Sequence, residues 1–292
     1  MANARALDKR RKSIRNIRKI TRTMELIATA RFRKAMDRAA AATDYTERIT
    51  QIVSSLAAAG LEVQHPLLEP RPDPRAAACL ILSSNRGLCG GYNGSLFRLA
   101  LPRIEELRGA MDHLDVDVSG KRGIGALKFR GVKTNQTYTQ FDDQPKFADV
   151  EAIANDYLAA YAAGKIDRLD VVYTKFHNVS KQEAVIETLL PLGTIDVDAD
   201  QAGGHNVSYE FLPTAESILE EVVPTSFKIR LFKCFLDAAV SEQVARMVAM
   251  KSATENAGEI IKQLSMTYNR ARQSQITGEI MEIIGGVEAL AN

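Results

Sequence analysis

The sequence predicts an α/β protein in which a long antiparallel coiled coil of the N- and C-terminal helices is joined to a central Rossmann-like α/β domain with a mostly parallel sheet. Two uninterrupted helical patterns, residues 3 to about 58 and 241–290, predict the coiled coil. Alternating strand and helix patterns between them predict the parallel sheet. We therefore expect an N-terminal shaft helix over 1–65, a central α/β domain over 66–210, and a C-terminal shaft helix over 211–292 that pairs with the first.

Both terminal patterns show the spacing of a helix seam. The N-terminal repeat, with two residues in the positions between, is Leu7, Ile14, Thr21, Ala28 and Ala35, with Ile17 and Met24. The C-terminal repeat is Met250, Ala257, Leu264 and Ala271, with Thr254, Ile261 and Tyr268 between, followed by a shifted stripe at Ile276, Ile280, Ile283, Val287 and Leu290. The alternative is two ordinary amphipathic helices on a globular core. Their length favours the coiled coil, because helices beyond about 25 residues rarely pack that way.

The central elements follow in order after the proline cluster at 66–74. Ala76–Ser83 reads as a buried strand, and Ser95 is expected to cap a helix that runs to about residue 107. A strand at 115–118, a helix from Gly120 to Phe129 and an extended segment at 134–141 come next. A helix at 150–163, strands at 169–176 and 182–190, and a helix capped by Thr214 complete the pattern.

A glycine-rich turn after the first strand invites a nucleotide interpretation. Arg86, Gly87, Gly90 and Gly91 lie where a strand meets a helix, which is the usual place for phosphate binding. The spacing is G-x-x-G-G-x-x-G, however, and neither the dinucleotide fingerprint nor a P-loop is present. These residues are therefore predicted to form a tight central-domain turn. We expect no catalytic residues, no metal site and no cofactor.

Charge is distributed unevenly along the chain. Residues 1–38 carry 13 Lys/Arg and 3 Asp/Glu, a net charge of +10, whereas the remainder carries 25 and 33, a net charge of −8. A basic arm of this density attracts an acidic protein surface, nucleic acid or anionic lipid. It has little aromatic interleaving, with Phe32 the only ring before Tyr45, so the stacking platform of single-strand binders is missing. Three cysteines without metal-ligand spacing indicate a reducing compartment.

Three long motifs resemble the gamma subunit of the F-type ATP synthase. They are KITRTMELIA at 19–28, SSNRGLCGG at 83–91, and SEQVARMVAMKSATENA with YNRARQSQIT between 241 and 277. The resemblance covers essentially the whole chain, and the motifs occur in the family's order.

The resemblance implies a non-catalytic central rotor shaft that couples proton flow through the membrane c-ring to ATP synthesis or hydrolysis at the beta subunits. The implied partners are the alpha and beta subunits, epsilon and the c-ring, with no nucleic acid. Carried over by matching residues, the implied beta-subunit contacts are Arg272, Gln273, Thr277, Glu279 and Met24, and the implied contacts of the foot with the c-ring are Tyr209 and Glu210.

Two further expectations concern the location and the tip. The first residues lack the apolar core of a signal peptide, and the inserted cysteine pair of the chloroplast type is missing. We therefore expect a bacterial protein, peripheral at the cytoplasmic face of the inner membrane. Gly278, Gly285 and Gly286 depart from a strong helix, each costing about 1 kcal/mol relative to Ala, which is expected to loosen the tip.

Two other function classes fit parts of the sequence. A basic coiled-coil nucleic-acid binder predicts affinity that falls steeply with salt. An enzyme that uses the loop at 87–94 for a nucleotide predicts stabilisation of the isolated chain by that nucleotide.

Overall fold

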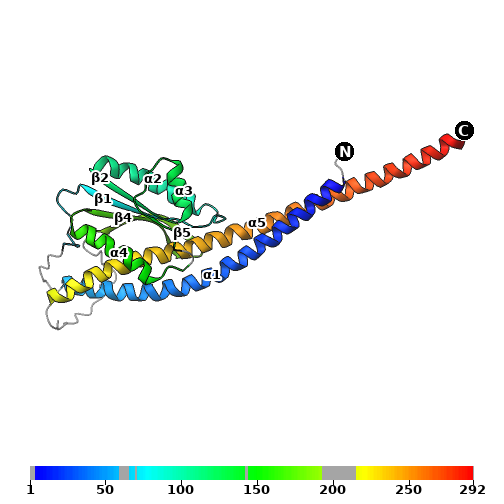
Figure 1. The fold of residues 1–292 in the computed structure, drawn as a ribbon. Coiled ribbons are helices and arrows are strands. Elements are labelled where there is room, and N and C mark those ends of the chain that lie inside the picture. Colours follow the sequence, from blue (N-terminus) through cyan, green and yellow to red (C-terminus); the bar gives the residue numbers. More distant parts are fainter. Residues whose placement is uncertain (1–3, 59–65, 70, 142–143, 193–214, 292) are drawn as a thin grey trace. The chain divides into compact units, whose positions relative to one another are not determined.

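The computed structural model describes residues 4–58, 66–69, 71–141, 144–192 and 215–291, and the chain forms two compact units. One unit comprises Met1–Thr29 with Arg246–Asn292, and the other comprises Ala30–Ala245. Two long helices pass through both units: α1 spans Ala4–Ala58 and α5 spans Ala215–Ala291 (Figure 1). The predicted domain boundaries near 65 and 210, and the predicted cap at Thr214, lie outside the described residues.

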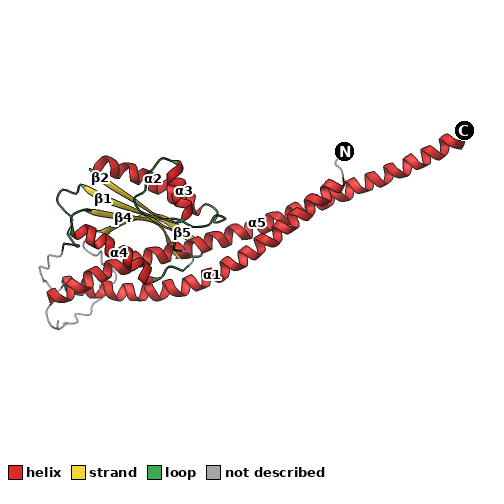
Figure 2. Cartoon of the chain, in the orientation of Figure 1, coloured by secondary structure: helices red, strands yellow, loops and turns green. Residues whose placement is uncertain are grey.

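The second unit contains a five-stranded sheet of order β3-β2-β1-β4-β5 (Figure 2). The strands are β1 (Ala76–Leu82), β2 (His113–Ser119), β3 (Thr137–Tyr138), β4 (Arg168–Asn178) and β5 (Lys181–Leu190). The first four are parallel, and β5 pairs antiparallel with β4 through a hairpin that closes between Asn178 and Lys181. The mostly parallel sheet is confirmed.

Helices cover both faces of this sheet, as a parallel sheet requires. In β1, Ala77, Cys79 and Ile81 pack against α2 (Tyr92–Ala110) and α3 (Lys121–Phe129). The alternate residues of the strand face a second cluster with α4 (Phe147–Ala162) and the N-terminal part of α5, where Phe227 and Leu231 are fully buried. Successive strand side chains point to opposite faces, so one short apolar strand supplies both cores.

Each terminal helix also contributes to the second unit. Ala35 and Ala39 of α1 pack with Leu236 and Val240 of α5, and Phe32 lies against Phe176 with ring centroids 6.3 Å apart. The small α1 side chains allow close approach of the two helices, as the sequence predicted for Ala35.

Three predicted element bounds are wrong, the first being the helix predicted over 150–163, which is α4 and begins three residues earlier, at Phe147. α2 begins at Tyr92 rather than at Ser95, because Gly91 is its N-cap and the carbonyl oxygen of Gly91 already accepts from Ser95 N–H at 2.9 Å. The extended segment predicted over 134–141 pairs with the sheet only at Thr137 and Tyr138, where Val118 and Ser119 are their partners in register.

Candidate functional site

The described parts of the first unit are residues 4–29 of α1 and 246–291 of α5, which we call the shaft. Its helices run antiparallel and share one seam (Figure 1). Ala28, Met250 and Ala257 are buried there, at 0%, 5% and 5% exposure. The remaining predicted seam residues that are half-buried are Leu7, Ile14, Thr21, Met24, Thr254, Ile261, Leu264, Tyr268 and Ala271.

In α1, the residues that lie between the positions of the seven-residue repeat differ in part from the prediction. Ile17 is 45% exposed, so its seam assignment is wrong. Arg11 is half-buried and Glu25 is buried, and these two residues stand one position out of step with the predicted spacing of Ile17 and Met24. Long charged side chains can occupy such positions because the aliphatic stem packs while the charged head reaches an edge or a partner.

Polar contacts hold the shaft helices together across the seam. Thr254 Oγ1 lies 2.8 Å from Thr21 Oγ1. The Arg11 guanidinium carbon lies 4.6 Å from the centre of the Tyr268 ring, and Arg11 also donates to Asp8 at 2.6 Å. The contacts pair early residues of α1 with late residues of α5, which fixes the antiparallel direction.

Beyond the start of α1, α5 continues as a single helix to Ala291, through all three tip glycines. Its predicted apolar stripe is exposed on this stretch, with Ile276 at 44%, Ile283 at 67% and Val287 at 64%. Gln273 and Thr277 are exposed as well. The part of the chain that the structure describes therefore leaves an apolar helix end open for a partner.

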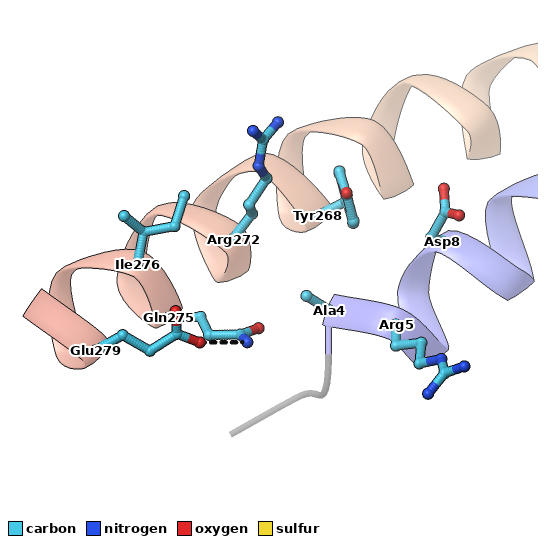
Figure 3. Close-up of a pocket in the computed structure, with 8 residues that line it drawn as sticks. All are labelled: Ala4, Arg5, Asp8, Tyr268, Arg272, Gln275, Ile276 and Glu279. Carbon is cyan, nitrogen blue, oxygen red and sulfur yellow. Dashed lines mark hydrogen bonds between the residues drawn. The ribbon is translucent and has the colours of Figure 1, made fainter.

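An open cavity of about 340 Å³ lies where the two helices part. Its lining residues are Ala4, Arg5 and Asp8 of α1 and Tyr268, Arg272, Gln275, Ile276 and Glu279 of α5 (Figure 3). Gln275 donates to Glu279 at 2.9 Å, while Arg5 and Arg272 project in opposite directions. The cavity brings together Arg272 and Glu279 of the predicted contact set, but it includes neither Gln273 nor Thr277 nor Met24. Tyr209 and Glu210 lie outside the described residues.

The loop over 84–93 is a tight turn held by its own side chains. Gly90 has φ +55° and Leu88 has φ +65°, so the chain passes twice through the left-handed region. Asn93 accepts from Ser84 N–H at 3.1 Å and donates to Ser84 Oγ at 2.7 Å, which closes the turn. Gly87 approaches the Arg122 guanidinium so closely that a Cβ would lie 2.9 Å from Nη2. Arg86 and Gly91 are exposed, and Gly91 adopts an ordinary φ of −82°.

This turn also caps the N-terminus of α3, the helix that follows β2. Lys121 N–H donates to Asn85 Oδ1 at 3.0 Å, Arg122 N–H to the Ser84 carbonyl at 3.0 Å, and Gly123 N–H to Ser83 Oγ at 2.9 Å. These three backbone donors of α3 therefore already have acceptors from the chain itself.

Several other buried polar groups are paired within the fold. Asp170, fully buried, accepts from Arg103 Nε at 2.8 Å and Arg168 Nε at 2.9 Å. Burial raises the pKa of Cys79 to about 12, so this thiol is not a nucleophile at neutral pH. The described residues hold no group of His, Cys, Asp and Glu arranged for a metal ion, and no helix among them is long and apolar enough to cross a membrane.

A family model described as ATP synthase matches residues 3–290. The ATP synthase gamma chain of Rhodopirellula baltica is 73% identical over 294 residues, covering 99% of both chains. This chain belongs to the ATP synthase gamma family. The gamma chains of Frankia casuarinae and Leptospira biflexa are 40% and 38% identical, over 97% and 100% of this chain and 96% and 100% of theirs.

Solved structures agree in fold. The rotor of the Euglena gracilis mitochondrial ATP synthase matches with a TM-score of 0.62 at 18% identity, over 94% of this chain and 98% of that one. A second Euglena gracilis structure, of the OSCP/F1/c-ring assembly, matches with a TM-score of 0.64 over 98% and 94%. At this identity the likeness concerns the fold alone.

Membership in the gamma family makes the chain a non-catalytic, peripheral subunit of a membrane complex, whose catalytic sites lie on the beta subunits. It favours the rotor prediction over the nucleic-acid binder and over the nucleotide-dependent enzyme. The sequence motifs at 19–28, 83–91 and 241–277 indicated the same family. The shaft seam and the tight turn of the central domain both include residues of these motifs.

Proposed function

We propose that the shaft turns inside the ring of alpha and beta subunits, and that the central domain with its foot stands on the c-ring and binds epsilon. Proton flow through the c-ring would then turn the shaft and change the states of the three beta sites. The proposal places the complex at the cytoplasmic face of a bacterial inner membrane. Gamma-family membership and the rotor fold support the role.

The observation that carries this proposal is the form of the shaft end. A two-helix seam gives way to a single helix whose exposed apolar side chains include Ile276, Ile283 and Val287. Isolated helices with exposed apolar stripes are stable in water only when something covers them. A ring of subunits around the tip would supply that cover.

Within this arrangement, Arg272, Gln273, Thr277 and Glu279 are proposed to contact the beta subunits near the tip, and Met24 lower on the shaft. The Arg272 guanidinium offers paired donors to a carboxylate, and Glu279 offers an acceptor next to it in the same cavity. Tyr209 and Glu210 are proposed as foot contacts with the c-ring. Residues 66–210 would form the body that carries them.

Co-assembly tests the proposal. The full chain should co-purify with alpha and beta subunits as one complex and should raise their ATP hydrolysis. A variant shortened to residue 272 keeps the seam but removes most of the exposed tip, and we expect it to bind at least about tenfold more weakly. Failure of the full chain to join an alpha–beta complex would contradict the proposed function.

A further inference from the structure

The tip of α5, residues 273–291, carries an exposed apolar stripe. Ile276, Ile280, Ile283 and Val287 recur at intervals of four, three and four residues, and they are 44%, 50%, 67% and 64% exposed. This alternation of three and four is the a/d spacing by which one helix packs against another. The tip stripe, formed by these four residues, therefore has the pattern of a coiled-coil seam but lies on the surface of the chain.

α1 carries a second exposed stripe beside the row that packs on α5. Ile17, Ile20 and Ile27 are 45%, 59% and 46% exposed, and with half-buried Met24 they recur at intervals of three, four and three residues. Ile20 and Ile27 each precede a residue of the shaft seam, and one residue turns a helix by about 100°. The α1 stripe, formed by these four residues, therefore points about a quarter turn away from α5 and is open to a further helix.

The two stripes lie in segments of opposite charge. Residues 273–291 contain three Glu and no Lys/Arg, a net charge of −3, whereas residues 4–24 contain nine Lys/Arg and one Asp, a net charge of +8. Glu279 and Glu282 each precede a residue of the tip stripe, Lys19 precedes one of the α1 stripe, and all three are exposed. Opposite charges attract a tip to an α1 segment, whereas like charges oppose the pairing of two tips or of two α1 segments.

A tip stripe cannot reach the α1 stripe of its own chain. Thr21 Oγ1 lies 2.8 Å from Thr254 Oγ1, so the α1 stripe is level with the part of α5 near residue 254. Ile276 lies about 33 Å further along the same continuous helix. The tip stripe therefore needs a helix from another molecule, and a second copy of this chain offers one with matching spacing and opposite charge.

We propose that the free chain forms a two-fold symmetric dimer in which the tip stripe of each copy packs on the α1 stripe of the other. Two shafts that lie side by side in opposite directions place each single-helix tip against the two-helix part of the partner. The two-fold axis repeats the contact, so both stripes of both copies are covered and association stops at two copies. The dimer goes beyond the proposed function and does not rest on it. Because the dimer covers the tip, it must dissociate before other subunits surround the shaft.

Sedimentation of the full chain at several concentrations tests the proposal, because a dimer forms by mass action. The unsubstituted chain is compared at low salt with three double substitutions: I280Q/I283Q in the tip stripe, I17Q/I20Q in the α1 stripe, and L26Q/M281Q outside both stripes. Leu26 and Met281 are 55% and 63% exposed, so this control removes the same number of exposed apolar side chains. Circular dichroism checks that all four chains have equal helix content.

The unsubstituted chain should be a dimer at about 50 µM and low salt, and its dissociation constant should rise by at least about fivefold in high salt. I280Q/I283Q and I17Q/I20Q should each weaken the dimer by at least about tenfold, whereas L26Q/M281Q should change it by less than about twofold. A mixture of the two weakened variants should associate more strongly than either alone, because the mixed dimer keeps one intact contact between a tip stripe and an α1 stripe.

An unsubstituted chain that stays monomeric at about 50 µM would overturn the proposal. So would an I17Q/I20Q variant that dimerises as strongly as L26Q/M281Q, since the tips would then pair with each other. Association beyond two copies would rule out the two-fold arrangement. Co-assembly with alpha and beta subunits judges the proposed function separately, so a chain that assembles with them but never dimerises rejects only this inference.

Discussion

Thr254 and Thr21 join the two shaft helices through their hydroxyl groups, 2.8 Å apart. Each hydroxyl also lies within hydrogen-bond distance of a carbonyl oxygen in its own helix, that of Met250 for Thr254 and that of Arg18 for Thr21. The pair therefore adds a hydrogen bond across the seam. When one threonine is replaced, the hydroxyl of the other still has a carbonyl acceptor in its own helix. Valine has the same shape and no hydroxyl, so it isolates that bond.

We expect a coupling free energy of about 1 kcal/mol between T21V and T254V in a double-mutant cycle. Denaturant unfolding of the four full-length chains measures it. Two substitutions whose effects on the free energy of unfolding simply add would contradict a bond across the seam.

Gly120 is expected to be irreplaceable, whereas a glycine five residues later is not. Gly120 has φ +99°, and a Cβ there would overlap the carbonyl oxygen of Ser83. G120A should lower the free energy of unfolding by about 2 kcal/mol or more. Gly125 lies inside α3 with open space around it, so G125A should raise that free energy by up to about 1 kcal/mol. Thermal unfolding of both variants provides the comparison.

The carboxyl of Asp237 in α5 makes stability dependent on pH. Burial raises its pKa to about 6, against the opposing effect of Lys233 and Lys175. The folded state then holds this proton more tightly than the unfolded state does, so the carboxyl costs stability as pH rises from about 4 to 6, and the cost persists above 6.

D237N should therefore stabilise the protein by about 1–3 kcal/mol at pH 7.5 and by much less at pH 4.5. The free energy of unfolding of both chains at the two pH values measures the difference. An equal effect of D237N at both pH values would show that Asp237 does not titrate in this range.

Met24 is half-buried at the edge of the seam, next to the Arg22–Glu25 pair. We expect M24K to reduce the protons pumped per ATP hydrolysed by at least about half, because it places a cation where the shaft surface is partly desolvated. M24L keeps the volume and the apolar character and should behave as the unsubstituted chain. Proton pumping that falls only in step with the yield of complex would count against this role.

The sequence was sufficient for most of the seam positions and for most strands. Met250 and Ala257 lie seven residues apart, as do Ala28 and Ala35, and this local pattern survives in the fold because each helix needs only one apolar row to find the other. The layers at Arg11 and Glu25 could not be predicted from an apolar rule. The Arg11 guanidinium is accommodated by the ring of Tyr268, which only the paired helices bring into place, and the Glu25 carboxylate by Arg22, three residues earlier in the same helix.

The turn over 84–93 was likewise predicted only in part from the sequence. Glycine spacing predicted a turn rather than a phosphate loop, and the left-handed Gly90 agrees. The acceptors of the backbone N–H groups at the start of α3 could not be predicted, because Asn85, which accepts from Lys121 N–H, is 36 residues away in the sequence. The start of α2 was also missed, since Ser95 has the residue type of a cap while Gly91 occupies the position.

Rotation of the shaft during ATP hydrolysis is the measurement that tests the account most directly. A probe belongs on Lys181, changed to cysteine at the exposed end of the β4–β5 hairpin, because the three native cysteines are buried. In a complex with immobilised alpha and beta subunits, the probe should turn in one direction in three equivalent steps per revolution. A complex that hydrolyses ATP at full rate while the probe stays fixed would contradict the central claim.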